Sequence, residues 1–133
     1  MKISVLLIDD DYSTNLYHEI ILNESACIER LDIKETTDDA LQFLKSITHL
    51  PDVILLDINM PIKSGWDFLD EYGNIVGNHQ MPLMVILSTT KMDEDIERAN
   101  RNPYVDLFDT KPLTLHKIEK YLNHPKIQKL KNR

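Results

Sequence analysis

Reactive polar side chains follow four of the short apolar runs in this chain of 133 residues. Asp9 and Asp10 follow the first of these runs, Asp57 the second and Ser88 the third, and Lys111 comes three residues after the fourth. Carboxylate oxygens are ligands that Mg²⁺ prefers, and a carboxylate can also attack phosphorus. A lysine and a hydroxyl can bind the oxygens of a transferring phosphoryl group. Together these residue types predict a magnesium-dependent phosphoryl-transfer site, provided that the fold brings them together.

The formal charges of these groups balance once a divalent cation is included. Asp9, Asp10 and Asp57 contribute three negative charges, and Lys111 contributes one positive charge. A divalent cation supplies the two positive charges that are missing, and Mg²⁺ suits a site of carboxylates, waters and phosphate oxygens. In this interpretation Asp57 is the nucleophile toward phosphorus, and Ser88 offers its hydroxyl to a phosphoryl oxygen.

Alternating strands and helices must position these residues. Strands are predicted for the apolar or alternating runs at 3–8, 28–36, 53–56, 83–87 and 105–108. Helices are predicted where apolar residues recur at helical spacing, around 16–21, 37–47, 68–76, 93–101 and 115–122. Five strands alternating with five helices predict an α/β fold with a doubly wound parallel sheet. Such sheets bind ligands beyond the carboxyl ends of their strands, where the polar residues lie.

The first predicted helix carries an apolar stripe and one histidine. The stripe consists of Leu16, Tyr17, Ile20 and Ile21, and Asp11 or Ser13 is available as its N-cap. His18 and the other four histidines have no metal-ligand spacing, so we expect all five at the surface.

Composition excludes several classes of protein. The chain has 15 Lys and Arg against 22 Asp and Glu, a net charge of −7, whereas nucleic-acid binding needs a basic face. Its single cysteine, Cys27, rules out an internal disulfide and fits a reducing cytoplasm. No apolar run approaches the ~20 residues that span a bilayer. The segment 124–133 is a basic C-terminal tail, predicted to be either a frayed, solvated end or a docking segment for an acidic partner.

Four motifs carry a family resemblance. LLIDDD, VILLDINMPIKSGWDFL, MVILST and FDTKP occur in this order. With the spacing of Asp10, Asp57, Ser88 and Lys111, they make roughly residues 2–123 resemble the receiver domain of two-component response regulators, in its stand-alone, CheY-like form. The resemblance implies a flavodoxin-like sheet with strand order 2-1-3-4-5 and a receiver domain at 1–123.

The resemblance also implies a role for each residue of the site. Asp57 is the phosphoacceptor and, with Asp10, a direct Mg²⁺ ligand. Asn59 offers its backbone carbonyl to the metal, and Asp9 binds it through a water. Ser88 and Lys111 act on the phosphoryl group.

The resemblance further implies which residues take part in switching and in shaping the loop after the fifth strand. Ser88 and Phe108 stand at the family's switch positions, and Pro112 at a position usually preceded by a cis bond. There are departures from the family pattern. Phe108 lacks the hydroxyl of the tyrosine often found there, and Thr89 replaces a small residue.

The function implied by the resemblance is phosphorelay signalling. The chain would accept a phosphoryl group from a histidine kinase or histidine phosphotransfer protein and catalyse only its own phosphorylation and dephosphorylation. A separate protein would bind the face formed by the fourth helix, fifth strand and fifth helix. We expect a cytoplasmic monomer or weak dimer that neither binds nucleic acid nor inserts into membranes.

Two alternatives remain open at this point. A haloacid-dehalogenase-like, Mg²⁺-dependent phosphatase would use Asp9 as its nucleophile, since IDDDYST contains an Asp-x-Asp pattern. A degenerate receiver would keep the fold as a binding module without taking phosphate.

Overall fold

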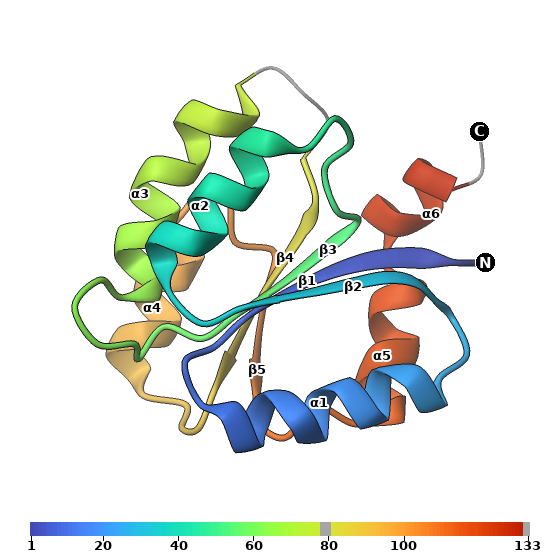
Figure 1. Ribbon diagram of the computed structural model, residues 1–133. Helices are drawn as coiled ribbons and strands as arrows, with labels where there is room; N and C mark the ends of the chain where they lie inside the picture. Colours follow the sequence, from blue (N-terminus) through green and yellow to red (C-terminus); the bar gives the residue numbers. More distant parts are fainter. Residues whose placement is uncertain (78–80, 132–133) are drawn as a thin grey trace.

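A five-stranded parallel sheet forms the centre of the protein (Figure 1). The computed structural model describes residues 1–77 and 81–131. The strands are β1 (Ile3–Ile8), β2 (Ile28–Lys34), β3 (Val53–Leu56), β4 (Leu83–Ser88) and β5 (Leu107–Thr110). Their order in the sheet is β2-β1-β3-β4-β5, as the resemblance predicts.

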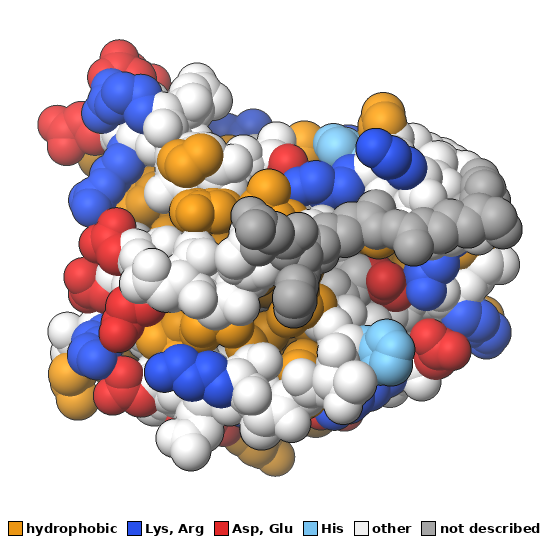
Figure 2. Space-filling view, turned by 90° about the horizontal axis from the view of Figure 1, so that it is seen from above, with side chains coloured by type: hydrophobic (Ala, Val, Ile, Leu, Met, Phe, Trp, Pro, Cys, Tyr) orange, Lys and Arg blue, Asp and Glu red, His pale blue; other side chains and the backbone are white. Residues whose placement is uncertain are grey.

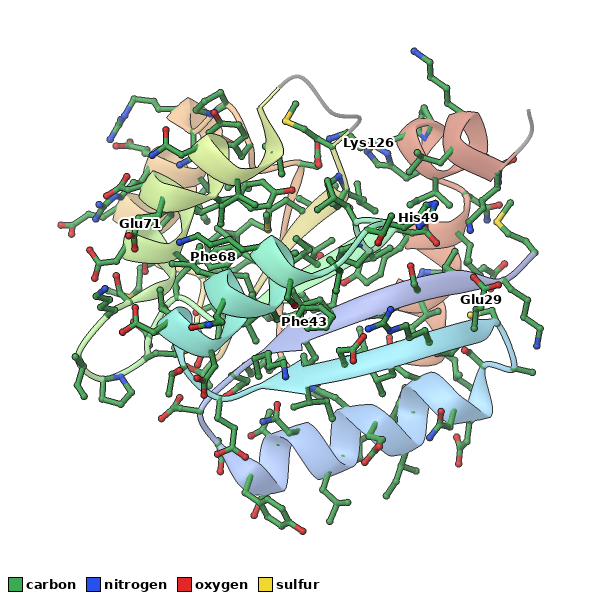
Figure 3. The ribbon with its side chains drawn as sticks, turned by 45° about the horizontal axis from the view of Figure 1, so that its top comes forward. Glu29, Phe43, His49, Phe68, Glu71 and Lys126 are labelled. Atoms are coloured by element: carbon green, nitrogen blue, oxygen red, sulfur yellow. The ribbon has the colours of Figure 1, made fainter. Side chains whose placement is uncertain are left out.

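Helices cover both faces of the sheet (Figure 1). They are α1 (Tyr12–Glu24), α2 (Thr37–Ser46), α3 (Gly65–Val76), α4 (Asp93–Arg101), α5 (Leu115–Leu122) and α6 (Pro125–Lys131). Alternate residues of each central strand point to opposite faces, because the side-chain period of a strand is two. Leu6 and Ile8 of β1 join the core beneath α2 and α3, whereas Val5 and Leu7 join the core beneath α1 and α5. Phe68, labelled in Figure 3, is fully buried on the inner side of α3.

The register of the central strands brings their carboxyl ends to one edge. Ile8 of β1 pairs with Leu56 of β3, which in turn pairs with Ile86 of β4. The residues that follow these positions therefore emerge side by side at the same edge of the sheet.

The fifth strand lies two residues later than predicted. It covers Leu107–Thr110 rather than 105–108, because Leu107 pairs with Val85 of β4. Val105 is apolar because it packs against the core beneath α2 and α3, although it lies outside the ladder. Asp106 accepts a hydrogen bond from the backbone N–H of Met84 through its side chain. The backbone N–H of Asp106 in turn donates to the carbonyl of Met84 at 2.9 Å, so Asp106 bonds to β4 through both its main chain and its side chain just before the ladder begins.

The buried face of α1 is not the predicted apolar stripe. Leu16, Tyr17 and Ile20 are exposed, whereas Asn15, His18 and Leu22 are buried. The prediction that His18 lies at the surface is therefore wrong, since the side chain is only 1% exposed. The polar pair faces the protein because it bonds to backbone groups of the site described below.

The frayed, solvated end predicted for the basic tail is wrong for residues 125–131. These residues form α6, in which Ile127 is fully buried against the core beneath α1 and α5. Lys126 pairs with Asp106 at 2.9 Å, and Lys131 pairs with Asp52 at 2.9 Å. Figure 3 shows Lys126 extending from α6 toward the start of β4. In Figure 2, Lys and Arg side chains on the upper face lie among Asp and Glu, so charge there is mixed.

The length and hydrophobicity of the helices decide whether any of them could span a membrane. Within residues 1–77 and 81–131, no helix combines the length and the apolar character needed to cross a bilayer.

Candidate functional site

Three carboxylates from two strand ends meet at the carboxyl edge of the sheet. Asp9 and Asp10 follow β1, and Asp57 follows β3. One carboxylate oxygen of each lies within 4.8 Å of one oxygen of each of the others. Asp9 and Asp57 are buried, whereas Asp10 is exposed. The register of β1 with β3 produces this cluster, as the sequence predicts.

Lys111 reaches the cluster from the loop after β5. Its Nζ lies 2.6 Å from Oδ2 of Asp9 and 3.6 Å from Oδ2 of Asp57. The backbone N–H of Lys111 donates to the carbonyl of Ser88 at 2.7 Å, which ties this loop to the end of β4. The peptide bond between Lys111 and Pro112 is cis, as the resemblance implies.

Backbone groups orient the two buried carboxylates. Asp57 Oδ1 accepts a hydrogen bond from the N–H of Asn59 at 3.1 Å, and Asp9 Oδ1 accepts one from the N–H of Asp11 at 3.0 Å. Gly65 is required at the start of α3, because a Cβ there would lie 2.6 Å from the backbone oxygen of Asp57. The loop between β3 and α3 therefore folds back closely beneath Asp57.

Asp57 has an unusual affinity for protons. Burial raises the pKa of its carboxyl to about 6, and the negative charges of Asp9 and Asp10 act in the same direction. The hydrogen bond from Asn59 and the charge of Lys111 oppose this increase without cancelling it. A cation beside Asp57 would compensate for the lost solvation of the carboxylate.

Ser88 and Thr89 border the cluster on the side of β4. Ser88 is fully buried at the last position of β4, two residues beyond the partner of Leu56 in the ladder. This register places Ser88 next to the strand end that carries Asp57. Thr89 is exposed, and it lines a hollow of about 380 Å³ together with Tyr17, His18, Lys111 and Pro112.

The remaining predicted residues occupy less central positions. Asn59 is exposed, and its N–H rather than its side chain contacts Asp57. Phe108 is half-buried in β5, where it pairs with Ile86 and packs against the core beneath α2 and α3.

Two residues of the site were missed in the sequence. Asn15 Nδ2 donates to the backbone carbonyl of Asp9 at 2.8 Å, and His18 Nε2 accepts from the N–H of Leu113 at 3.2 Å. The available signal was their spacing, because Asn15, His18 and Leu22 recur on one helical face.

The chemistry of the donor set fits Mg²⁺. The three carboxylates offer hard oxygen ligands at the right spacing, and no histidine or cysteine belongs to the group found among the described residues. With Lys111 included, the cluster carries a net charge of −2, which a divalent cation neutralises.

The fold and this acidic site define a receiver domain. The model of the response regulator receiver domain matches residues 5–123, and the chain belongs to this family. It is similar to a two-component response regulator from Cytophaga hutchinsonii, with 29% identity, a TM-score of 0.84 and coverage of 92% of this chain and 96% of that one. A response regulator receiver protein from Dyadobacter fermentans is 26% identical, with a TM-score of 0.81 and coverage of 90% and 94%.

The curated relatives are longer proteins. A protein-glutamate methylesterase/protein-glutamine glutaminase from Rhodopseudomonas palustris is 36% identical over 96 residues, which is 71% of this chain and 25% of that protein. The chain spans between 23% and 37% of the length of the curated relatives it matches. None of these comparisons supports the haloacid-dehalogenase-like alternative. The chain is thus a receiver domain of two-component signalling.

Proposed function

We propose that the protein accepts a phosphoryl group on Asp57 from the phosphohistidine of a histidine kinase or phosphotransfer protein. The observation that carries this proposal is the convergence of Asp57 with Asp9, Asp10 and Lys111 in one partly enclosed cluster. An isolated carboxylate would be a poor phosphoacceptor, because negative charge accumulates as a phosphoryl group approaches it.

The transfer exchanges one bond to phosphorus for another. A carboxylate oxygen of Asp57 forms a P–O bond as the P–N bond of the phosphohistidine breaks, and the imidazole leaves with the electron pair. Lys111 lies within 3.6 Å of the same carboxylate and stabilises charge on the phosphoryl oxygens. Asp10, Asp57 and the backbone carbonyl of Asn59 would hold Mg²⁺ directly, and Asp9 through a water. When bound, Mg²⁺ supplies further stabilisation of that charge.

We further propose that phosphorylation is transmitted through Ser88 and Phe108 to the face of α4, β5 and α5. A phosphoryl group carries about −2 at neutral pH and attracts hydroxyl and ammonium donors. The Ser88 hydroxyl then moves toward the phosphate, and the half-buried ring of Phe108 fills the space it leaves. The shallow packing of α4 supports a displacement of this helix, since Ala99 is its one buried residue. A helix with so little buried surface is displaced at low cost.

The exposed side of α1 supports docking of a phosphodonor protein. Tyr12, Leu16, Tyr17 and Ile20 are between 46% and 70% exposed. Large apolar side chains grouped on one helix are typical of a protein contact. Tyr17, one of these four residues, lines the same hollow as Lys111. Signalling to a separate protein, a monomeric or weakly dimeric state and a cytoplasmic location are parts of the same proposal.

Phosphorylation with a small donor tests the proposal. The protein is incubated with acetyl phosphate and Mg²⁺, and intact mass and peptide mapping are recorded. We expect one adduct of ~80 Da, the mass of a phosphoryl group, on Asp57, lost in Asp57→Asn and retained in Asp70→Asn, an exposed control on α3. An adduct on Asp9 that persists in Asp57→Asn would instead support a phosphatase-like nucleophile. No adduct on the wild-type protein would support a degenerate receiver.

A further inference from the structure

Two buried polar residues on α1 bond to the main chain at or near the two partners of the ion pair between Asp9 and Lys111. Asn15 and His18 lie one helical turn apart and are 4% and 1% exposed. Polar side chains are rarely buried this completely unless they form hydrogen bonds. Each of them bonds to a backbone group of the site and to no group of a neighbouring helix among the bonds found in residues 1–77 and 81–131.

The first contact fixes the backbone of Asp9. Asn15 Nδ2 donates to the carbonyl oxygen of Asp9 at 2.8 Å. The same residue receives Lys111 Nζ on its side-chain Oδ2 at 2.6 Å. Asn15 therefore holds the main chain of the residue whose carboxylate pairs with Lys111.

The second contact fixes the loop that carries Lys111. His18 Nε2 accepts a hydrogen bond from the N–H of Leu113, two residues after Lys111. Because Nε2 is the acceptor, the proton of the neutral ring resides on Nδ1. Burial lowers the pKa of His18, and the positive charge of Lys111 acts in the same direction. Lys117 adds to this effect and Asp9 opposes it. A lowered pKa favours the neutral ring, which is the form that can accept the bond from Leu113.

These contacts close a ring of interactions. α1 holds Asp9 through Asn15 and Leu113 through His18, and the pair between Asp9 and Lys111 joins the two. We propose that Asn15 and His18 are positioning residues for phosphoryl transfer, which set the location of the Lys111 ammonium relative to Asp57. The effect on the reaction rests on the proposed function, whereas the effect on the loop does not.

Phosphorylation rates and amide hydrogen exchange of variants together test this inference. Small displacements of a catalytic group carry large rate costs, so His18→Leu and Asn15→Leu should slow phosphorylation by saturating acetyl phosphate and Mg²⁺ about tenfold. His18→Gln should stay within about threefold of wild type, because Gln Oε1 can accept at the position of Nε2. The Asn side chain in His18→Asn is too short for its oxygen to reach the N–H of Leu113, so this variant should be phosphorylated as slowly as His18→Leu. Matched controls are His116→Leu and Asn23→Leu, which change exposed residues.

Amide hydrogen exchange gives a readout that does not depend on phosphorylation. The N–H groups of Leu113 and Lys111 should exchange faster in His18→Asn than in His18→Gln, with Gln close to wild type. Equal rates and equal exchange for His18→Asn and His18→Gln would overturn the inference. If the wild-type protein takes no phosphoryl group, the proposed function fails, and the exchange of Leu113 still decides whether His18 holds the loop.

Discussion

Lys111 pairs more closely with Asp9 than with Asp57. Its ammonium is 2.6 Å from Asp9 Oδ2 and 3.6 Å from Asp57 Oδ2, although 102 residues separate Lys111 from Asp9 in the chain. Both partners are largely buried, so each compensates for the lost solvation of the other. If Asp57 accepts a phosphoryl group as proposed, that group would compete with Asp9 for Lys111 and so link the reaction to the loop after β5.

Replacing Lys111 should separate metal binding from phosphoryl transfer. Lys111→Met leaves Asp9 buried without its cation, and the free energy of unfolding without Mg²⁺ should fall by about 3 kcal/mol. The three carboxylates are then neutralised by the metal alone, so Mg²⁺ should bind about tenfold more tightly. Phosphorylation of Asp57 should nevertheless be slower. Urea unfolding with and without Mg²⁺ measures the first two effects.

The control for this variant is Lys129→Met, which removes an exposed lysine from α6. It should leave both stability and Mg²⁺ affinity within experimental error of wild type. Weaker Mg²⁺ binding in Lys111→Met than in wild type would contradict the arrangement of charges described here.

The last helix should stabilise the domain without affecting its chemistry. Ile127 is fully buried, and Ile127→Ala should lower the free energy of unfolding by about 2–4 kcal/mol. The ion pairs of Lys126 and Lys131 join α6 to Asp106 and Asp52, which lie near the amino ends of the strands and away from the site. The rate of phosphorylation by acetyl phosphate should therefore be unchanged. Slower phosphorylation of folded Ile127→Ala than of wild type would contradict the prediction that α6 affects stability alone.

Sequence patterns predicted the sheet and the acidic cluster because both depend on strong local signals. Runs such as Val53–Leu56 are apolar at every position, which is typical of strands buried on both faces. Parallel strands end at one edge of a sheet, so the sequence alone predicts that Asp9 and Asp57 lie close together. The positions of the fifth strand and of α6 were harder to predict. Leu107–Thr110 is only partly buried, and α6 owes its position to Ile127 and to ion pairs with distant residues.

The orientation of α1 could not be predicted from hydrophobicity. Its most apolar side, with Leu16 and Ile20, faces outward, and its polar pair faces the site. A pattern of apolar residues identifies a helix but does not distinguish a face that packs inside the domain from one that faces outward. The two bonds that decide the orientation go to the backbone of Asp9 and Leu113, which no side-chain pattern records.

A third buried carboxylate, Asp109, should contribute to stability through its hydrogen-bond partners. Asp109 of β5 accepts hydrogen bonds from Tyr121 at 2.6 Å and from Lys120 at 2.8 Å. Burial alone would raise the pKa of Asp109, but these bonds, together with the positive charges of Lys120 and Lys117, outweigh burial and lower the pKa. Tyr121→Phe should therefore lower the free energy of unfolding by about 1–2 kcal/mol at neutral pH.

The stabilisation by Asp109 should disappear in acid. A carboxyl with a lowered pKa stabilises the fold above its unfolded pKa of about 4, and the contribution is lost as pH falls below that value. The difference between wild type and Tyr121→Phe should accordingly shrink toward pH 3. Tyr12→Phe, at a tyrosine that is 70% exposed, serves as the control and should match wild type throughout. If the difference in free energy of unfolding between wild type and Tyr121→Phe grew in acid, the bond to Asp109 would not be the source of the stabilisation.

Asp57 should change the pH dependence of stability in the opposite direction to Asp109, because its pKa is raised to about 6 rather than lowered. Between pH 4 and pH 6 the folded protein holds a proton on Asp57 that the unfolded chain has released, so stability is lost as pH rises through about 6. At pH 7.5 without Mg²⁺, Asp57→Asn should therefore raise the free energy of unfolding, by at most about 3 kcal/mol. The gain should vanish near pH 4, where wild-type Asp57 is itself neutral. Millimolar Mg²⁺ should stabilise wild type but hardly affect Asp57→Asn, so that the two converge. Denaturant unfolding at pH 4, 6 and 7.5, with EDTA or Mg²⁺, measures each of these differences. If Asp57→Asn were less stable than wild type at pH 7.5 in EDTA, the Asp57 carboxyl would not be a desolvated group with a raised pKa.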